Sequence, residues 1–230
     1  MEFRVGTGGW QYLPLETVDK LRSYSKIFDF VEVNSTFYSR IPLGTVARWR
    51  EVVPPEFEFA VKCSSEVIPL LRSGDRSRLS AVLEYMSSVC EVLGSDILVL
   101  QTPSRLDPSR ASEGALLDLV NHAEIHSLRL AWEVRSNPTP ELLSFFKTHG
   151  VVQVTDLSRE PPILPGEVLY SRLFGRGRHN LYRFTTEDFR RIEDGAVSSR
   201  ATKAYFAFHG VAMYADALRF KKSIRAGQTS

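Results

Sequence analysis

Long apolar runs, cysteines and net charge are all scarce in this chain of 230 residues. No stretch approaches the ~20 consecutive apolar residues that span a bilayer, so we expect no membrane association. Two cysteines, Cys63 and Cys90, are too few for a disulfide framework and lack the spacing of a metal site. We expect both to be buried in a protein of the reducing cytoplasm. A net charge of +2 indicates no particular class of partner.

Other signals are missing as well. The Gly-rich stretch at Gly6–Gly9 lacks the GxGxxG spacing, which excludes a dinucleotide fingerprint there. The first residues, MEFRVGTGGW, enter a strand-like pattern at once, so we expect no signal peptide. No linker, low-complexity run or simple repeat interrupts the chain, and residues 1–230 are therefore predicted to form one domain. No pattern indicates an oligomeric state.

Apolar stretches of strand length alternate with helical patterns along the chain. The clearest stretch is FVEVNSTFY, Phe30–Tyr38, which begins as a strand that is apolar on both faces and ends as a loop of polar side chains. The other predicted strands are Phe3–Gly9, Phe57–Cys63, Asp96–Pro103, Leu128–Arg135, Val151–Asp156, Leu169–Phe174 and Lys203–Gly210. Helices are predicted over Pro14–Ile27, Leu43–Val53, Asp75–Leu93, Glu113–His126, Thr139–His149, after a cap at Thr186, and over Met213–Ile224.

Eight strands alternating with helical segments predict a compact TIM-like (β/α)8 barrel. The connection after strand six, LSREPPILPG, is predicted to be irregular because its prolines oppose a full helix. An open doubly wound sheet is the alternative. The barrel is favoured because the alternation continues to the C-terminal end of the chain.

Seven predicted strands end in a polar or charged residue whose parity directs it into the barrel. The catalytic groups of such barrels lie at the carboxyl ends of the strands. Ionised groups there need mutual pairing or a ligand, so the alternatives are a ligand site and buried pairs such as Glu32 with Lys62 or Arg135 with Asp156. The set is Glu32, Asn34, Lys62, Gln101, Glu133, Arg135, Asp156, Arg172 and His209.

Several motifs also resemble a known family. VGTGGWQY, FVEVNSTFY, FEFAVKC, LVLQTP, AWEVR and FHGVAMYADALRFKKSI are similar to the YecE-like family, also called domain of unknown function 72. The resemblance covers nearly the whole chain, and it implies a TIM-like barrel without assigning a reaction. Many members carry His-Gly after the Arg of strand seven, where this chain has Leu173-Phe174-Gly175, and Asn near the end of strand eight, where this chain has His209.

The loop after strand seven is basic and rich in glycine. Arg176 and Arg178 alternate with Gly175 and Gly177. The loops after strands seven and eight of such barrels often bind phosphate, and both backbone N–H groups and guanidinium groups suit its oxygens. The alternative is a solvated basic loop.

The favoured hypothesis is an enzyme that performs hydrolytic acid–base chemistry on a small anionic substrate, such as a phosphodiester or a sugar phosphate. Glu133 is the candidate general acid or base, with Glu32 or Asp156 as its partner. The cationic residues of the site would stabilise developing negative charge. The predicted substrate-binding residues are Asn34, Lys62, Gln101, Arg135, Arg172, Tyr38, Trp10 and His209.

Three alternatives stay open. No cofactor is predicted, but Glu32, Glu133, Asp156 and His209 would suit a divalent metal, although nearby arginine and lysine oppose a cation. A nucleic-acid-binding module would use the basic loop for phosphates and stack bases on Trp10, Tyr12, Tyr38 and Tyr182. A non-catalytic sensor would bind a small anion without changing it.

Overall fold

A computed structural model of the chain describes residues 1–103, 111–135, 138–176 and 180–227. Its eight parallel strands close into a barrel in chain order, which confirms the predicted TIM-like architecture. The strands are β1 (Glu2–Thr7), β2 (Phe30–Val33), β3 (Glu58–Lys62), β4 (Ile97–Thr102), β5 (Arg129–Val134), β6 (Val152–Thr155), β7 (Val168–Leu173) and β8 (Lys203–Phe208).

Most of the connections between consecutive strands contain a helix. They are α1 (Lys20–Ser25), α2 (Ser35–Tyr38), α3 (Leu43–Glu51), α4 (Val67–Ser73), α5 (Arg76–Leu93), α6 (Glu113–Ile125), α7 (Pro140–Thr148), α8 (Thr186–Ser199) and α9 (Met213–Gly227). No helix separates β6 from β7, as the prolines of that connection predict. Among the helices in the described ranges, none combines the length and the apolar character that crossing a bilayer requires.

The chain divides into two compact units, which we describe separately. Unit 1 comprises Met1–Glu32, Val53–Glu58 and Gln153–Ser230. Unit 2 comprises Val33–Val52 and Phe59–Val152.

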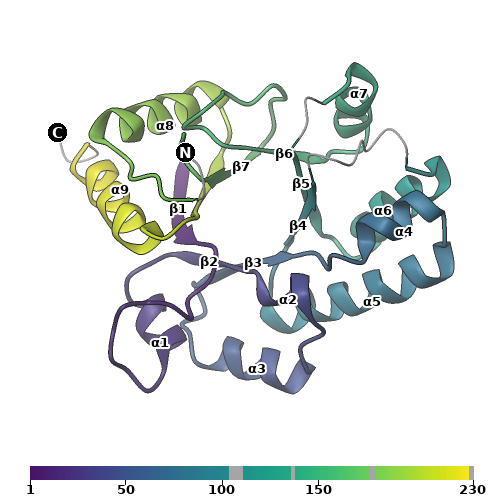
Figure 1. The fold of residues 1–230 in the computed structure, drawn as a ribbon, viewed down its shortest axis with the longest axis horizontal. Coiled ribbons are helices and arrows are strands. Elements are labelled where there is room, and N and C mark those ends of the chain that lie inside the picture. The colour runs from purple at the N-terminus through teal and green to yellow at the C-terminus, as the bar shows by residue number, and fades with distance from the viewer. Residues whose placement is uncertain (104–110, 136–137, 177–179, 228–230) are drawn as a thin grey trace. The chain divides into compact units, whose positions relative to one another are not determined.

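Helices α8 and α9 of unit 1 pack against aromatic rings on the outward face of β8. The ring centroids of Phe206 and Phe208 lie 5.0 and 5.6 Å from that of Phe220 on α9, and Phe208 also packs against Phe189 of α8. Figure 1 shows α9 alongside β1 and next to α8. Because neighbouring residues of a strand point to opposite faces, Tyr205 on β8 faces the barrel interior.

The inward side chains of unit 1 form three layers. At the amino ends of the strands, Glu58 accepts hydrogen bonds from Arg4 Nε at 2.6 Å and Lys203 Nζ at 2.8 Å. Burial tends to raise the pKa of Glu58, but hydrogen bonds from Lys203, Tyr205 and Arg4 outweigh it and hold the pKa below its ordinary value. The middle layer is aromatic, with the rings of Phe30 and Tyr205 5.2 Å apart. The third layer, at the carboxyl ends, is polar.

Helix α1 is shorter than the sequence predicts. Periodicity predicts a helix over Pro14–Ile27, whereas α1 covers Lys20–Ser25. The reason is Asp19, whose backbone is extended and whose side chain accepts a hydrogen bond from Arg22 N at 3.0 Å. Val18 is consequently exposed in irregular chain. A local N-cap here overrides apolar spacing.

The first two strands come unusually close at the glycine-rich stretch. A Cβ atom on Gly6 would lie 2.1 Å from the carbonyl oxygen of Phe30, so β1 needs glycine at this position. The buried Tyr24 hydroxyl accepts a hydrogen bond from Thr7 N at 2.8 Å and donates one to Phe30 O at 3.0 Å. Burial raises the pKa of Tyr24, so the hydroxyl keeps the proton that it donates.

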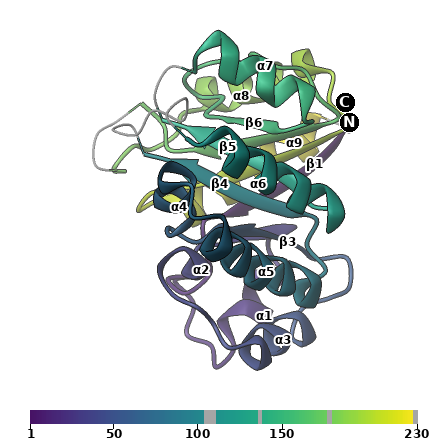
Figure 2. The same cartoon turned by 90° about the vertical axis from the view of Figure 1, so that its right-hand side faces the viewer.

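Unit 2 is built around α5, which packs against α3, α4 and α6 (Figure 2). This helix follows the Asp75 cap, whose side chain accepts a hydrogen bond from Arg78 N at 3.1 Å, and it ends at Gly94 with a φ of 64°. The sequence predicts both boundaries. Helix α4 was not predicted, because its seven residues include Pro69 and are too few to show a helical period.

The parity predicted for β5 is confirmed. The ring of Trp132 lies 5.3 Å from that of Phe146 on α7, and its Nε1 donates to Thr102 Oγ1 at 2.6 Å. Trp132 therefore faces the covering helix. Glu133, the next residue, points to the opposite face of the strand.

The polar end of FVEVNSTFY is not the loop that the sequence predicts. Strand β2 ends at Val33, and Asn34 has helical dihedral angles and precedes α2. Thr36 Oγ1 holds this turn by donating to Lys62 O at 2.6 Å and Val33 O at 3.0 Å. The predicted loop is therefore a short helix, and the inward direction that strand parity predicts for Asn34 does not follow, because Asn34 lies outside β2.

A second boundary also differs. The N-cap of α8 is Thr185 rather than the predicted Thr186. Thr185 Oγ1 accepts from Asp188 N at 3.2 Å, and the Asp188 carboxylate accepts from Thr185 N at 2.8 Å, which completes a capping box. Burial tends to raise the pKa of Asp188, but hydrogen bonds from the Thr185 backbone and from Tyr182 outweigh it and lower the pKa.

Both cysteines are buried and free, as predicted. Burial raises the pKa of Cys63 to about 12 and raises that of Cys90 as well. The two thiols therefore behave as small apolar side chains rather than as nucleophiles.

Candidate active site at the carboxyl ends of the strands

The polar layer of unit 1 is built on a buried ion pair between Glu32 of β2 and Arg172 of β7. Their side chains are 0% and 2% exposed. Arg172 Nε donates to Glu32 Oε2 at 3.1 Å, and Arg172 Nη2 donates to Oε1 at 3.0 Å. The Tyr170 hydroxyl donates to Oε2 at 3.0 Å. Such a two-pronged contact fixes both the position and the orientation of the carboxylate.

His209 lies beside this pair, directly after β8. Its Nε2 is 3.6 Å from Glu32 Oε1, which is within ion-pair range but longer than a hydrogen bond. The His209 ring stacks on that of Phe174 at 4.6 Å, and Arg172 Cζ lies 5.3 Å from the Phe174 ring centroid. The backbone also holds the residue, because His209 N donates to Leu173 O at 2.8 Å. We call Glu32, Tyr170, Arg172, Phe174 and His209 the Glu32 cluster.

Burial sets the protonation state of the phenol in this cluster. Desolvation raises the pKa of Tyr170 well above its ordinary value, and the neighbouring Glu32 carboxylate adds to the rise. Tyr170 therefore acts as a neutral donor. Tyr170 and Phe174 were missed by the sequence predictions, although both share the inward parity of Arg172 on the same strand and its extension.

Asp156, the predicted partner acid, holds the end of β7 together. Its Oδ2 accepts hydrogen bonds from Phe174 N at 3.0 Å and Gly175 N at 3.2 Å. Its Oδ1 accepts from Ser158 N at 3.1 Å and from the Ser158 hydroxyl at 2.6 Å. Both oxygens are thus engaged in shaping two loops, which is a positioning role.

The predicted phosphate loop is only partly within the described residues. The N–H of Gly175 is directed to Asp156, and its φ of 72° suits glycine. Arg176 is exposed, and its Nε donates to Ser158 O at 3.3 Å. Gly177 and Arg178 lie outside the described residues. Phosphate binding by this loop stays a prediction.

Unit 2 brings together a second set of predicted residues on β4 and β5. Glu133 accepts a hydrogen bond from Arg135 Nε at 3.0 Å, and Gln101 stands beside Glu133 in the strand register. Glu133 is mostly shielded and Arg135 is exposed. On β3, the nearly buried Lys62 places its Nζ 4.2 Å from the centroid of the Phe37 ring, a cation–π contact.

The aromatic residues predicted to stack on bases differ widely in exposure. Trp10 is buried at 8% exposure, whereas Tyr12 and Tyr38 are 82% and 78% exposed. Tyr182 donates its hydroxyl to Asp188 Oδ2 at 2.8 Å. Two of the four rings are therefore committed to packing or to an internal hydrogen bond, and a nucleic-acid surface stays a prediction.

Comparison with protein families identifies the family of this chain. The model of a family described as a protein of unknown function, DUF72, matches residues 4–230. The chain belongs to the DUF72 family. This match confirms the resemblance to the YecE-like family, which is another name for DUF72. No curated protein matches the chain.

Solved structures with the same fold include two DUF72 proteins. One from Enterococcus faecalis has a TM-score of 0.75 at 19% identity, with 97% of this chain and 98% of that chain covered. One from Thermotoga maritima has a TM-score of 0.72 at 22% identity, with 98% and 100% covered. The 3-keto-D-glucoside 4-epimerase of Escherichia coli has a TM-score of 0.65 at 11% identity, with 98% and 100% covered. At these identities the likeness shows the fold alone.

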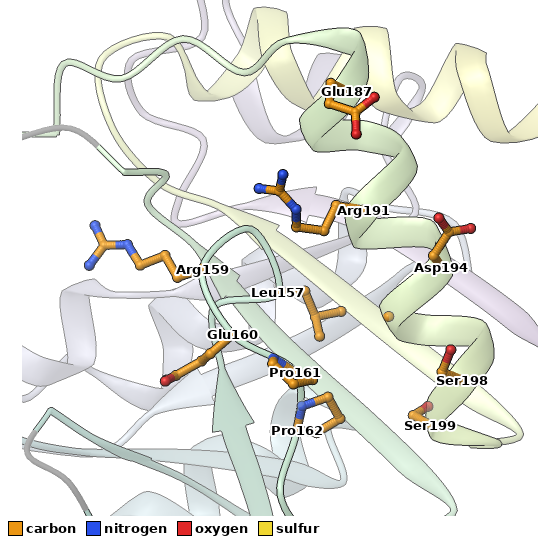
Figure 3. A pocket seen from close by; sticks show the side chains of 11 residues that line it. Leu157, Arg159, Glu160, Pro161, Pro162, Glu187, Arg191, Asp194, Ser198 and Ser199 are labelled. Carbon is orange, nitrogen blue, oxygen red and sulfur yellow. The ribbon is translucent and has the colours of Figure 1, made fainter.

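A separate hollow of this DUF72 chain was not predicted from the sequence. It has a volume of about 430 Å³ and lies in unit 1 between α8 and the connection after β6 (Figure 3). Arg159 and Arg191 line it together with three carboxylates, so it carries no excess of positive charge. Arg159 Nε already donates to Gly175 O at 2.6 Å. The three carboxylates are those of Glu160, Glu187 and Asp194. The hollow is therefore a poor match for an anion.

Proposed function

We propose that this DUF72 protein is an enzyme that performs acid–base chemistry on a small anionic substrate. The observation that carries the proposal is the placement of His209 at the carboxyl end of β8, with Nε2 3.6 Å from the buried carboxylate of Glu32. Histidine is the side chain most often used for proton transfer in enzymes. A neighbouring carboxylate stabilises the imidazolium that forms when the ring accepts a proton.

The other members of the Glu32 cluster would hold the imidazole in place. Glu32 is the orienting carboxylate, and Arg172 holds it in place through two hydrogen bonds. Phe174 fixes the plane of the imidazole by stacking at 4.6 Å. A buried ion pair contributes little net stability compared with apolar residues of similar volume, so its presence favours a functional role. In this proposal Glu32, Arg172 and Phe174 are positioning residues.

The anionic substrate class rests on Arg176, which is exposed in the loop that follows β7. Arg172 is buried and bonded to Glu32, so it does not contribute to this exposed charge. A guanidinium group in this position suits a phosphate ester. In the simplest reaction, His209 takes a proton from water as water attacks phosphorus. The bond from phosphorus to the alcohol oxygen then breaks, and the proton passes to that oxygen.

Sugar phosphates are the first substrates to try. The E. coli epimerase with the same fold acts, by its name, on a keto-glucoside, which makes sugar derivatives a reasonable starting panel. Glu133 in unit 2 is a second predicted proton-transfer group, and it accepts a hydrogen bond from Arg135. Variants at His209 and Glu133 therefore belong in the same experiment.

The test is turnover of a panel of sugar phosphates and phosphodiesters, followed by phosphorus NMR. We expect His209→Gln to lower the rate by at least about 100-fold, the usual contribution of one acid–base group, while the thermal shift produced by the substrate is kept. The matched control is His149→Gln, because His149 is exposed at the end of α7 and outside both sets of residues. Its rate should equal that of the unaltered protein.

Other outcomes would contradict the proposal. Unchanged turnover in His209→Gln, with loss in Glu133→Gln, would transfer the role to Glu133. Thermal stabilisation by an anion with no chemical change in it would favour the sensor. Oligonucleotide binding that weakens steeply with salt, without turnover, would favour the nucleic-acid alternative.

A further inference from the structure

Two histidines and a glutamate gather on the outer helices of unit 2. His122 lies in the last turn of α6, and His126, four residues on, is the C-cap of that helix, while Glu84 lies on the neighbouring α5. His122 Nδ1 is 3.7 Å from Glu84 Oε1, and His126 Nε2 is 3.9 Å from Glu84 Oε2. Among the described residues, these three offer ligand atoms that all lie within 4.8 Å of one another.

The distances suit a shared cation better than direct hydrogen bonds. Both contacts exceed the 2.7–3.2 Å of a hydrogen bond from nitrogen to oxygen, by at least about 0.5 Å. A tetrahedral zinc ion with bonds of about 2.0–2.1 Å separates its ligand atoms by about 3.4 Å. Glu84 is 61% exposed, so its side chain can close the remaining gap without disturbing the packing of α5.

A neighbouring hydroxyl holds one imidazole in the orientation that a metal needs. Ser87 Oγ is 2.7 Å from His122 Nε2, and the His122 side chain is only 12% exposed. With the proton on Nε2 donated to Ser87, the lone pair of His122 Nδ1 points towards Glu84. Metal-binding histidines commonly have their second nitrogen fixed in this way. The ring centroids of His122 and His126 are 4.3 Å apart, so the imidazole of His126 lies directly beside that of His122.

We propose that Glu84, His122 and His126 form a binding site for a divalent transition metal ion, with Zn²⁺ as the first candidate. Imidazole ligands favour zinc, copper and nickel over magnesium and calcium. Three protein ligands leave the fourth position of a tetrahedral ion open to water. The site shares no residue with the Glu32 cluster or with the Glu133 set. A bound ion would link α5 to α6.

The test uses tag-free, chelator-treated full-length protein and two probes, Co²⁺ and Zn²⁺. We expect Co²⁺ to give the visible absorption of a tetrahedral site at one ion per chain, and Zn²⁺ in hundredfold excess over its Kd to raise the Tm by about 5 °C or more. His126→Gln removes one ligand at the partly exposed C-terminal end of α6 and should abolish both signals. Ser87→Ala should weaken Zn²⁺ binding by about 10–100-fold.

The control separates this site from other surface imidazoles. His149→Gln removes an exposed histidine outside the group and should leave the Co²⁺ spectrum and the Zn²⁺ affinity unchanged. The proposal fails if the unaltered protein gives neither a Co²⁺ spectrum nor a Tm shift. It also fails if His126→Gln binds Zn²⁺ as tightly as the unaltered protein, or if His149→Gln loses the ion.

Discussion

Replacing Glu32 with glutamine should destabilise the protein by about 3–5 kcal/mol, the usual cost of removing one partner of a buried ion pair. The carboxylate is fully buried, and Arg172 donates to both of its oxygens. The substitution leaves the guanidinium charge facing a neutral amide. Two unit charges about 4 Å apart attract by about 4 kcal/mol at an effective dielectric constant near 20, which agrees with that range. The amide oxygen can still accept from the Tyr170 hydroxyl, so the charge accounts for most of the loss.

The assay is urea denaturation of a double-mutant cycle at pH 7 and 25 °C, followed by two spectroscopic probes. Arg172→Met should cost a similar amount, because it leaves the carboxylate charge buried. The double variant, with glutamine and methionine, buries neither charge, so its loss should be smaller than the sum by about 2 kcal/mol or more. A cost below about 1 kcal/mol for Glu32→Gln, or losses that simply add, would refute the reasoning.

Three further predictions concern residues outside the Glu32 cluster. The pKa of Glu58 is lower in the folded protein than its ordinary value of 4.5, so the stability that Glu58 contributes is present above pH 4.5 and is lost as the pH falls through the folded pKa. The free energy of unfolding should therefore fall less between pH 6 and pH 3 in Glu58→Gln than in the unaltered protein. Gly175→Ala should cost about 2 kcal/mol or more, since φ is 72° and the new Cβ would lie 2.0 Å from the Tyr182 ring, whereas the control Gly44→Ala, in open space on α3, should gain about 0.5–1 kcal/mol in the same denaturation assay. Thr185→Ala should lower the free energy of unfolding by about 1 kcal/mol by breaking the capping box, and an unchanged value would contradict that role.

Strand parity was the most reliable information in the sequence. The alternation in β8 places Phe206 and Phe208 against the outer helices, as the ring contacts show, and it directs Tyr205 and Ala207 to the interior. The same rule groups Glu32 with Arg172 as inward residues at strand ends. Parity works because the strand period of two is fixed by the backbone, whatever the side chains do.

Contacts between residues that are far apart in the sequence could not be predicted from strand parity. The sequence offers Glu32 with Lys62 and Asp156 with Arg135 as buried pairs, and it does not single out the contact between Glu32 and Arg172. The choice depends on which side chains reach one another across the barrel interior, and a period gives no such information. The helical pair at His122 did carry a signal that could have been used, namely two histidines at a spacing of four.

The Asp156 carboxylate gives the end of β7 an unusual property. The amide hydrogens of Phe174 and Gly175 lie beyond the strand, where loop amides normally exchange with deuterium within seconds to minutes. Both are directed at Asp156 Oδ2, at 3.0 and 3.2 Å, so each can exchange only when the carboxylate releases it. The slowly exchanging segment should therefore extend two residues past the end of β7. Phe174, whose ring stacks on His209, should then have a backbone amide that exchanges as slowly as those of the strand.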